Sequence, residues 1–249
     1  MNLATFNIIC LAWAIIAIIT FFFLQHVNAP YGRHIKQGWG PTLPNKWGWA
    51  FMEFPSFAIM LYFFIVSNQS AFAGMLSVLW MAHYFNRSFI FPFRIRTKGK
   101  EMPLIIVVSA IVFNLVNAWL NGYFLSAFEK YTENSFLEWN FLAGLALFVF
   151  GFIVNLISDH RLINLRHPGE TGYKIPRGFL FEYVSCPNHF GELVQWFGFA
   201  LMAWNYPAAC FFIWTAANLI PRSKKHHSWY RANFTDYPRN RKAVIPGLL

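Results

Sequence analysis

Charged residues are scarce in this chain of 249 residues, where Asp, Glu, Lys and Arg together make up only 12%. A soluble domain normally carries about a quarter, so this composition excludes an ordinary soluble protein. Hydrophobic residues make up 57% of the chain and aromatic residues 20%. They form uncharged runs long enough to cross about 30 Å of hydrocarbon as helices. The sequence therefore predicts an integral membrane protein.

Acidic residues are especially few, with 10 Asp and Glu against 20 Lys and Arg and a net charge of +10. Such a balance can indicate a nucleic-acid partner. In a membrane protein, however, Lys and Arg gather in the cytoplasmic loops. We therefore expect the lipid bilayer and no nucleic acid as a partner, with some of the basic side chains available to hold an anionic ligand.

Cysteine is also rare, and Cys10, Cys186 and Cys210 form neither a CxxC pair nor a metal-ligand spacing with histidine. This pattern predicts no disulfide framework, no redox centre and no metal site. The GxGxxG, P-loop and HExxH motifs are absent as well. A nucleotide bound here would thus be held without a Rossmann domain.

Apolar runs divide the chain into membrane spans. The first lacks a basic segment before it and a small-residue cleavage site, so it is expected to stay in the protein. A last apolar run, 193–220, is long for one span and short for two, and Pro207 predicts a break into two short helices. The other expected spans cover residues 6–24 and 49–66, a segment ending near residue 93, and residues 103–124 and 141–157.

The fold class expected from this pattern is a single all-α membrane domain of seven helices, with six helices and a re-entrant hairpin as the alternative. The connectors after the first, third and fifth spans hold most of the Lys and Arg, whereas those after the second and fourth hold only Lys130. The positive-inside rule then places the N-terminus outside and the basic C-terminal tail in the cytoplasm. In a bacterium this would be the inner membrane.

Glu53 is a carboxyl group about one turn into an expected apolar helix, which is costly and points to function. Burial favours its neutral form, which can donate a hydrogen bond to a ligand carbonyl. The alternative is a glutamate that reaches the interface or pairs with a basic neighbour. Tyr84 could donate to the same carbonyl or serve as an interface tyrosine. Arg87 is expected to extend towards the interface.

The segment 155–192 is strongly polar although it lies between two apolar runs. Together with the tail it offers cations for phosphates and polar groups for a ribose or an amide. The positive-inside rule is the competing explanation for each basic residue. The residues alone thus indicate a polar, anion-binding cytoplasmic pocket. Its candidate members are Asn155, Asp159, Arg166, Lys174, Asn188, Arg222, His226 and Tyr230.

At these residues the chain resembles the steroid 5α-reductase family (3-oxo-5α-steroid 4-dehydrogenases), and within it a bacterial member. YGRH at 31–34 fits more weakly than the other segments. The matching segments are EFPSF (53–57), HYFNRSF (83–89), NLISDHRLINLRHPGE (155–170), YKIPRGFLFEYVSCPNHFGE (173–192), HHSWY (226–230) and DYPRNRKAVIP (236–246).

The resemblance implies NADPH-dependent reduction of the C4–C5 double bond of a 3-oxo-Δ4 steroid, with Glu53 and Tyr84 hydrogen-bonded to the 3-keto oxygen. Lys174 stands where arginine is expected, which keeps the charge but loses the bidentate fork. Arg96, Lys98 or Lys100 would meet the 2′-phosphate. The implied NADPH site contains Asn155, Asp159, Arg166, Tyr173, Lys174, Asn188, Arg222, His226 and Tyr230, bordered by Tyr31 and Glu192.

In this scheme the first spans choose an apolar substrate that enters from the membrane, while 155–192 and 222–246 hold NADPH from the cytosol. Three alternatives remain open. The chain could reduce another apolar enone or alkene, such as a polyprenol or an enoyl thioester, or be an isoprenylcysteine-type methyltransferase. It could also bind or transport lipids without catalysis, although polar residues gathered at one predicted face argue against a transport path.

Overall fold

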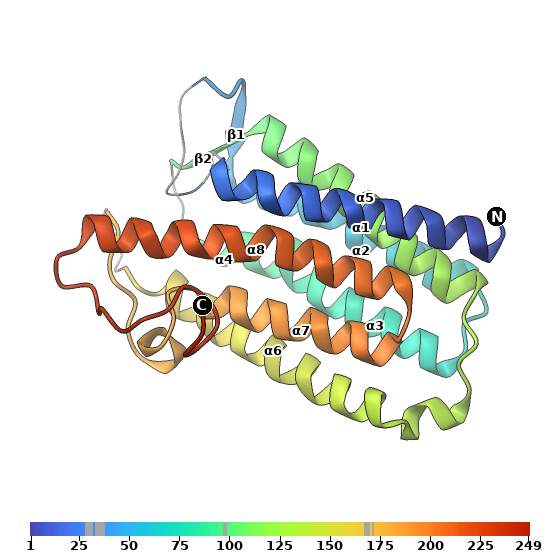
Figure 1. Ribbon diagram of the computed structural model, residues 1–249. Coiled ribbons are helices and arrows are strands. Elements are labelled where there is room, and N and C mark those ends of the chain that lie inside the picture. The colour runs from blue at the N-terminus through green and yellow to red at the C-terminus, as the bar shows by residue number, and fades with distance from the viewer. Residues whose placement is uncertain (28–31, 33–37, 97–98, 167–169, 171) are drawn as a thin grey trace. The chain divides into compact units, whose positions relative to one another are not determined.

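The computed structural model describes residues 1–27, 32, 38–96, 99–166, 170 and 172–249. These residues are overwhelmingly helical (Figure 1), which agrees with the expected all-α membrane protein. Within the described ranges the strands are short: β1 (Thr42–Pro44) pairs antiparallel with β2 (Glu101–Pro103).

The expected spans coincide with helical segments, apart from Pro103, which ends β2, and the break in the last apolar run. The described helices are α1 (Leu3–His26), α2 (Asn45–Val66), α3 (Ala71–Phe85), the π-helix η2 (Asn86–Ile90), α4 (Phe91–Arg94), α5 (Leu104–Ala127), the 3₁₀-helices η3 (Glu133–Leu137) and η4 (Phe179–Glu182), α6 (Trp139–Ile163), α7 (Pro187–Ala203) and α8 (Tyr206–Asn233). Among them α1, α2, α5 and α6 are each long and apolar enough to cross a membrane. The expected total of seven crossings stays a prediction.

The last apolar run breaks where proline predicts a break, because α7 ends at Ala203 and α8 begins at Tyr206. Pro207 then occupies the first turn of α8, where its missing N–H costs nothing. The Asn205 side chain accepts a hydrogen bond from the backbone N–H of Ala208 at 2.9 Å, which caps the new helix. The prediction of two short helices was wrong for α8, which has 28 residues.

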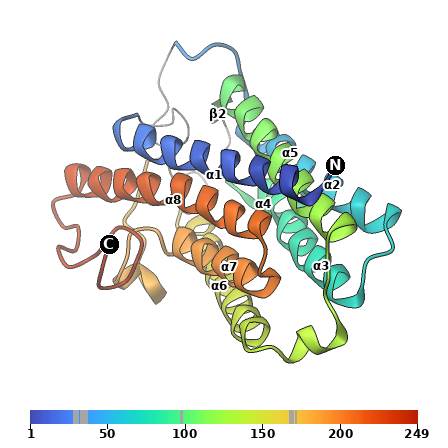
Figure 2. The same ribbon diagram turned by 45° about the vertical axis from the view of Figure 1, so that its right-hand side comes forward.

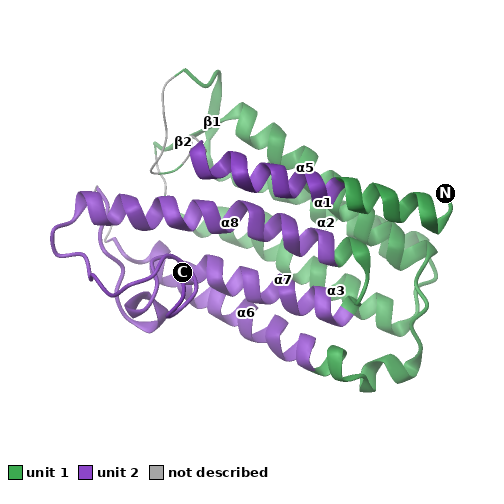
Figure 3. Cartoon of the chain, viewed as in Figure 1, with its two compact units in different colours: residues 1–12, 29–142, 203–208 green, residues 13–28, 143–202, 209–249 purple. Residues whose placement is uncertain are grey.

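The chain forms two compact units, each built from separate stretches of sequence (Figure 3). The first unit contains Met1–Ala12, Ala29–Leu142 and Ala203–Ala208. In it α2 packs against α5 and α3. Phe6 of α1 lies fully buried among the rings of Trp119, Tyr123, Phe124 and Phe128. Aromatic packing of this kind holds the start of α1 onto α5.

The second unit contains Trp13–Asn28, Ala143–Met202 and Ala209–Leu249. In it α6 and α7 lie side by side, as Figure 1 and the turned view of Figure 2 both show. Gly144 faces Gly198, and Gly151 faces Gly191. A Cβ atom added at Gly151 would lie 2.4 Å from the Gly191 carbonyl oxygen. Small residues therefore allow these backbones to touch, which places the end of α6 beside the start of α7.

Candidate active site

Glu53 lies in the interior of α2, with a side chain that is only 13% exposed. The helix begins at Asn45 rather than near Trp49, because the β1–β2 pairing fixes the chain directly before it. Glu53 therefore sits about two turns inside the helix, deeper than the sequence suggested. A carboxyl group this deep in an apolar helix needs polar partners.

Arg87 is one of those partners, since its Nη2 lies 3.4 Å from Glu53 Oε1. The guanidinium also stacks over the rings of Trp49 and Phe91, at 4.7 and 4.5 Å from their centroids. The π-helix η2, a form often found at functional sites, carries this arginine. The expectation that Arg87 extends towards the interface was wrong, because its side chain is buried against Glu53 and two rings.

Tyr84 is buried near the end of α3, at 4% exposure. Its ring stacks on Trp80 at 5.3 Å. The Trp80 Nε1 donates to the Ser56 hydroxyl and carbonyl oxygens at 3.2 and 3.3 Å. This chain of contacts fixes Tyr84 relative to α2, the helix that carries Glu53.

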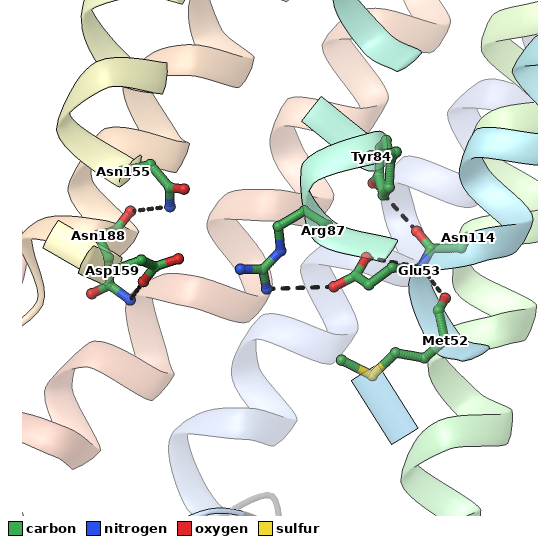
Figure 4. A network of polar contacts seen from close by, with 8 residues as sticks. All are labelled: Met52, Glu53, Tyr84, Arg87, Asn114, Asn155, Asp159 and Asn188. Atoms are coloured by element: carbon green, nitrogen blue, oxygen red, sulfur yellow. Dashed lines mark hydrogen bonds and ion pairs between the residues drawn. The ribbon is translucent and has the colours of Figure 1, made fainter. Parts of the chain in front are cut away.

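Asn114 of α5 joins the two predicted catalytic residues (Figure 4). Its Oδ1 accepts from the Tyr84 hydroxyl at 3.3 Å. Its Nδ2 donates to the Met52 carbonyl at 2.6 Å and to Glu53 Oε2 at 3.4 Å. The structure thus brings Glu53 and Tyr84 into one polar cluster. Sequence reasoning missed Asn114, although an asparagine in the middle of an apolar span is the signal that could have found it.

In the second unit, Asn155, Asp159 and Asn188 form one hydrogen-bonded group, also drawn in Figure 4. Asn155 Nδ2 donates to the Asn188 carbonyl at 3.0 Å, and Asn188 Nδ2 donates to Asp159 Oδ1 at 3.2 Å. Within the described part of the chain, the buried Asn155 Oδ1 and Ser158 Oγ have no hydrogen-bond partner. Such buried polar atoms are costly, so this group is suited to a polar ligand.

Arg166, Tyr173 and Lys174 lie in the loop between α6 and α7. Arg166 Nη1 donates to the Gly172 carbonyl at 3.1 Å, and its guanidinium lies 5.9 Å from the Tyr173 ring. Tyr173 in turn meets the ring of Trp229 at 5.0 Å. Lys174 forms an exposed ion pair with Glu170 at 2.6 Å. The loop thereby contacts α8.

Arg222, His226 and Tyr230 lie on one face of α8, because they are spaced four residues apart. The His226 ring lies 5.8 Å from that of His189 on α7, whose Nδ1 is 2.8 Å from Ser223 Oγ. Tyr230 is buried, at 2% exposure. Glu192 lies one turn after Asn188 on α7. The second unit therefore brings these predicted cofactor residues together around α6, α7 and α8.

The C-terminal tail is held against the loop before α7, an arrangement that the sequence did not reveal. Arg241 is 2% exposed and donates through Nη1 to the Pro176 carbonyl at 3.0 Å. It also pairs with Glu182 at 3.6 Å. The backbone N–H of Gly178 donates to Glu182 and, together with Arg241, lowers the pKa of that carboxyl group. Gly178 adopts a φ of +76°, a conformation that favours glycine.

Ser185 forms a second contact between this loop and the tail. Its hydroxyl lies 2.6 Å from both His227 Nδ1 and the Tyr237 hydroxyl. Burial lowers the pKa of His227, and the nearby charges of Arg231 and Lys242 lower it further. The neutral imidazole therefore suits this position.

Some predicted residues gain no structural support. Tyr31 and Lys98 lie outside the described residues, and Arg96 is exposed. Within the described ranges no group of His, Cys, Asp and Glu side chains could hold a metal ion. The three cysteines, all among the described residues, are buried and form no disulfide.

A family model for 3-oxo-5-alpha-steroid 4-dehydrogenase matches residues 100–249. A steroid 5-alpha-reductase of Gossypium hirsutum is 42% identical over 250 residues, which cover 97% of this chain and 96% of that protein. The chain belongs to the 3-oxo-5-alpha-steroid 4-dehydrogenase family. The 3-oxo-5-alpha-steroid 4-dehydrogenase 1 of Rattus norvegicus is 43% identical over 230 residues, or 91% and 88% of the two chains.

The similarity extends to the protein of the same name from Homo sapiens, which is 40% identical over 228 residues, covering 90% of this chain and 88% of that protein. The predicted family and the prediction of an oxidoreductase in it are thereby confirmed. The matched residues 100–249 contain Asn114 and every cofactor candidate from Asn155 onwards. The roles of individual residues stay predictions.

Proposed function

We propose that this protein reduces the C4–C5 double bond of 3-oxo-Δ4 steroids to 5α-dihydro products with NADPH. Family membership supports reduction of such steroids. The observation that carries the residue-level proposal is the cluster of Glu53, Tyr84 and Asn114 inside apolar helices. The 3-keto group of such a steroid is a strong hydrogen-bond acceptor on an apolar ring system, and this cluster offers hydrogen-bond donors in apolar surroundings.

In the proposed mechanism Glu53 and Tyr84 hydrogen-bond the 3-keto oxygen and draw electron density from C5. When bound, NADPH supplies the hydride that C5 receives. The same two side chains then stabilise negative charge that develops on the ketone oxygen, a contribution worth about 3–4 kcal/mol for one donor in other enzymes. Addition of a proton at C4 completes the reduction. An apolar chamber that excludes bulk water favours both hydrogen bonds.

The resting geometry suits an exchange of partners. The Tyr84 hydroxyl has one hydrogen, which points to Asn114 at 3.3 Å, and Arg87 and Asn114 reach Glu53 at 3.4 Å. These bonds are long, so giving one up to a ketone costs little. Glu53 must carry a proton in order to donate, whereas Tyr84 donates in its ordinary neutral form.

The side chains of the second unit include the polar and cationic groups that NADPH would need. The buried Asn155 Oδ1 and Ser158 Oγ suit the carboxamide of a nicotinamide, since one accepts and the other can do either. Arg166, Lys174 and Arg222 supply cations for phosphates. We further propose that His226 and Tyr230 line this site, with Tyr31 and Glu192 at its border and Arg96, Lys98 or Lys100 at the 2′-phosphate.

The proposed orientation places the N-terminus outside and the C-terminus in the cytoplasm, at the inner membrane if the source is a bacterium. The steroid enters from the bilayer and NADPH from the cytosol. The excess of basic residues in the odd-numbered connectors and the tail supports this orientation. A reporter fused after Leu249 should give a cytoplasmic signal, and an external signal would contradict the orientation.

The activity can be tested on the purified protein in lipid, with NADPH and either progesterone or testosterone as substrate. The expected result is loss of NADPH absorbance together with the mass of the 5α-dihydro product. Polyprenol and enoyl thioester substrates in the same assay test the alternative of another apolar enone or alkene. Reduction of those compounds without reduction of any Δ4-3-ketosteroid would replace the proposed substrate class.

A further inference from the structure

Asn114 hydrogen-bonds through both the nitrogen and the oxygen of its side chain within the first unit. The residue lies in the middle of α5 and is 3% exposed. Its two N–H groups reach the Met52 carbonyl and the Glu53 carboxyl, and its oxygen receives the Tyr84 hydroxyl. One carboxamide therefore connects α2, α3 and α5 at the point where both predicted catalytic residues lie.

The chemistry of these partners fixes which way the amide points. If the amide were turned over, Oδ1 would face the oxygens of Met52 and Glu53, and Nδ2 would face the Tyr84 hydroxyl. The 2.6 Å hydrogen bond to the Met52 carbonyl, which can only accept, would be replaced by oxygen–oxygen repulsion. The acceptor of Asn114 is thus directed at Tyr84 and its donors at α2, and the side chain holds this orientation.

The hydrogen bond from Asn114 to the Met52 carbonyl lies in a part of α2 that lacks one backbone hydrogen bond. Pro55 lies inside α2 and lacks the N–H that would bond back to Phe51. The helix is therefore weakened around Glu53, and the 2.6 Å bond from Asn114 ties it to α5 one residue before Glu53. Asn117, the next buried asparagine of α5, instead donates to the Phe113 carbonyl of its own helix at 2.8 Å.

We propose that Asn114 is a positioning residue that holds Glu53 and Tyr84 at one distance from each other and presents both to the substrate carbonyl. The inference rests on the proposed function. Asn114 acts through its two neighbours, so its loss allows each to move. Misplacement of catalytic groups by about 1 Å costs on the order of 10²-fold in rate. Replacement of Asn114 should therefore lower kcat and leave the affinity for NADPH unchanged, because no contact of Asn114 described above reaches a cofactor candidate.

The test compares Asn114→Leu and Asn114→Asp with a matched control, Asn117→Leu, in purified protein. Asn114→Leu removes all three bonds, and Asn114→Asp keeps the acceptor for Tyr84 but removes the donors. Both should lower kcat for progesterone by on the order of 10²-fold while the Kd for NADPH changes less than about twofold. Asn117→Leu should keep both values near those of the unchanged protein.

A double-mutant cycle separates positioning from general destabilisation. In a Tyr84→Phe background, Asn114→Leu should cost much less than in the unchanged protein, because part of its effect passes through Tyr84. Equal losses in both backgrounds, or loss of NADPH binding in both Asn114 variants, would assign Asn114 a structural role only and overturn the inference. Full turnover in the variants would overturn it as well. No steroid reduction by the unchanged protein would instead refute the proposed function, and the inference with it.

Discussion

At the scale of single residues, the sequence offered two alternatives for Glu53: a functional carboxyl group, or a glutamate that pairs with a basic neighbour. The carboxyl group pairs with a basic neighbour, Arg87, and it also lies in a cluster with Tyr84 through Asn114. Pairing therefore does not exclude a catalytic role. A protonated Glu53 keeps a carbonyl oxygen that can accept a hydrogen bond from Arg87, so this contact is compatible with donation from the carboxyl group to a ketone.

Glu53→Gln tests the proposed role of the carboxyl group. Glutamine has nearly the same shape, but its amide N–H is a weaker hydrogen-bond donor than a carboxyl O–H, so kcat for a Δ4-3-ketosteroid should fall by on the order of 10²-fold or more. The Kd for NADPH should stay nearly constant. Glu133→Gln, an exposed glutamate of η3, is the control that should change neither value. Loss of NADPH binding in a folded Glu53→Gln protein would place Glu53 in the cofactor site.

At the scale of helices, local patterns in the sequence predicted the apolar helices and the break near Pro207. The start of α2 at Asn45 was missed because it depends on pairing between residues 42–44 and 101–103. The partners of Asn114 and Arg241 were missed for the same reason, since each contact joins segments far apart in the chain. The position of Glu53 in an apolar span, the nearby Tyr84 and the motif resemblance pointed to these two residues, but only the fold shows what holds them.

The contact between α6 and α7 predicts a strong effect of Gly151→Ala. The added Cβ would lie 2.4 Å from the backbone of Gln195 and of Gly191, so the helices must separate. Overpacking of this kind costs about 1–3 kcal/mol, which should lower the thermal unfolding midpoint clearly. Gly74→Ala is the control, because its Cβ would meet Phe64 at an ordinary 3.6 Å. Equal midpoints for the two variants would contradict the close packing.

The contact of Ser185 with His227 predicts a pH dependence of stability. The pKa of His227 lies below its ordinary value of 6.5 in the folded protein, so the unfolded chain binds more protons between these two values. Stability should therefore be complete above pH 6.5 and fall as the pH drops below it. His227→Gln should reduce this dependence in thermal unfolding, whereas His160→Gln, at an exposed position, should leave it unchanged. An identical pH dependence in His227→Gln would refute this assignment.

At the scale of the whole molecule, the chain is a membrane oxidoreductase of the 3-oxo-5-alpha-steroid 4-dehydrogenase family. Composition alone predicted the membrane and the helical class, because long uncharged runs have few other stable solutions. The two proposed roles fall in different compact units. Glu53, Tyr84 and Asn114, proposed to act on the substrate ketone, belong to the first unit, and the NADPH candidates from Asn155 to Tyr230 belong to the second.

The measurement that tests the central proposal most directly is reduction of testosterone by the purified protein with NADPH deuterated at the transferable position. The proposal predicts a 5α-dihydro product that carries deuterium at C5, with little product from Glu53→Gln under the same conditions. Deuterium at C4, or a deuterated product formed equally fast by Glu53→Gln, would contradict the roles given to Glu53 and Tyr84. No dihydro product from any Δ4-3-ketosteroid would contradict the proposed activity itself.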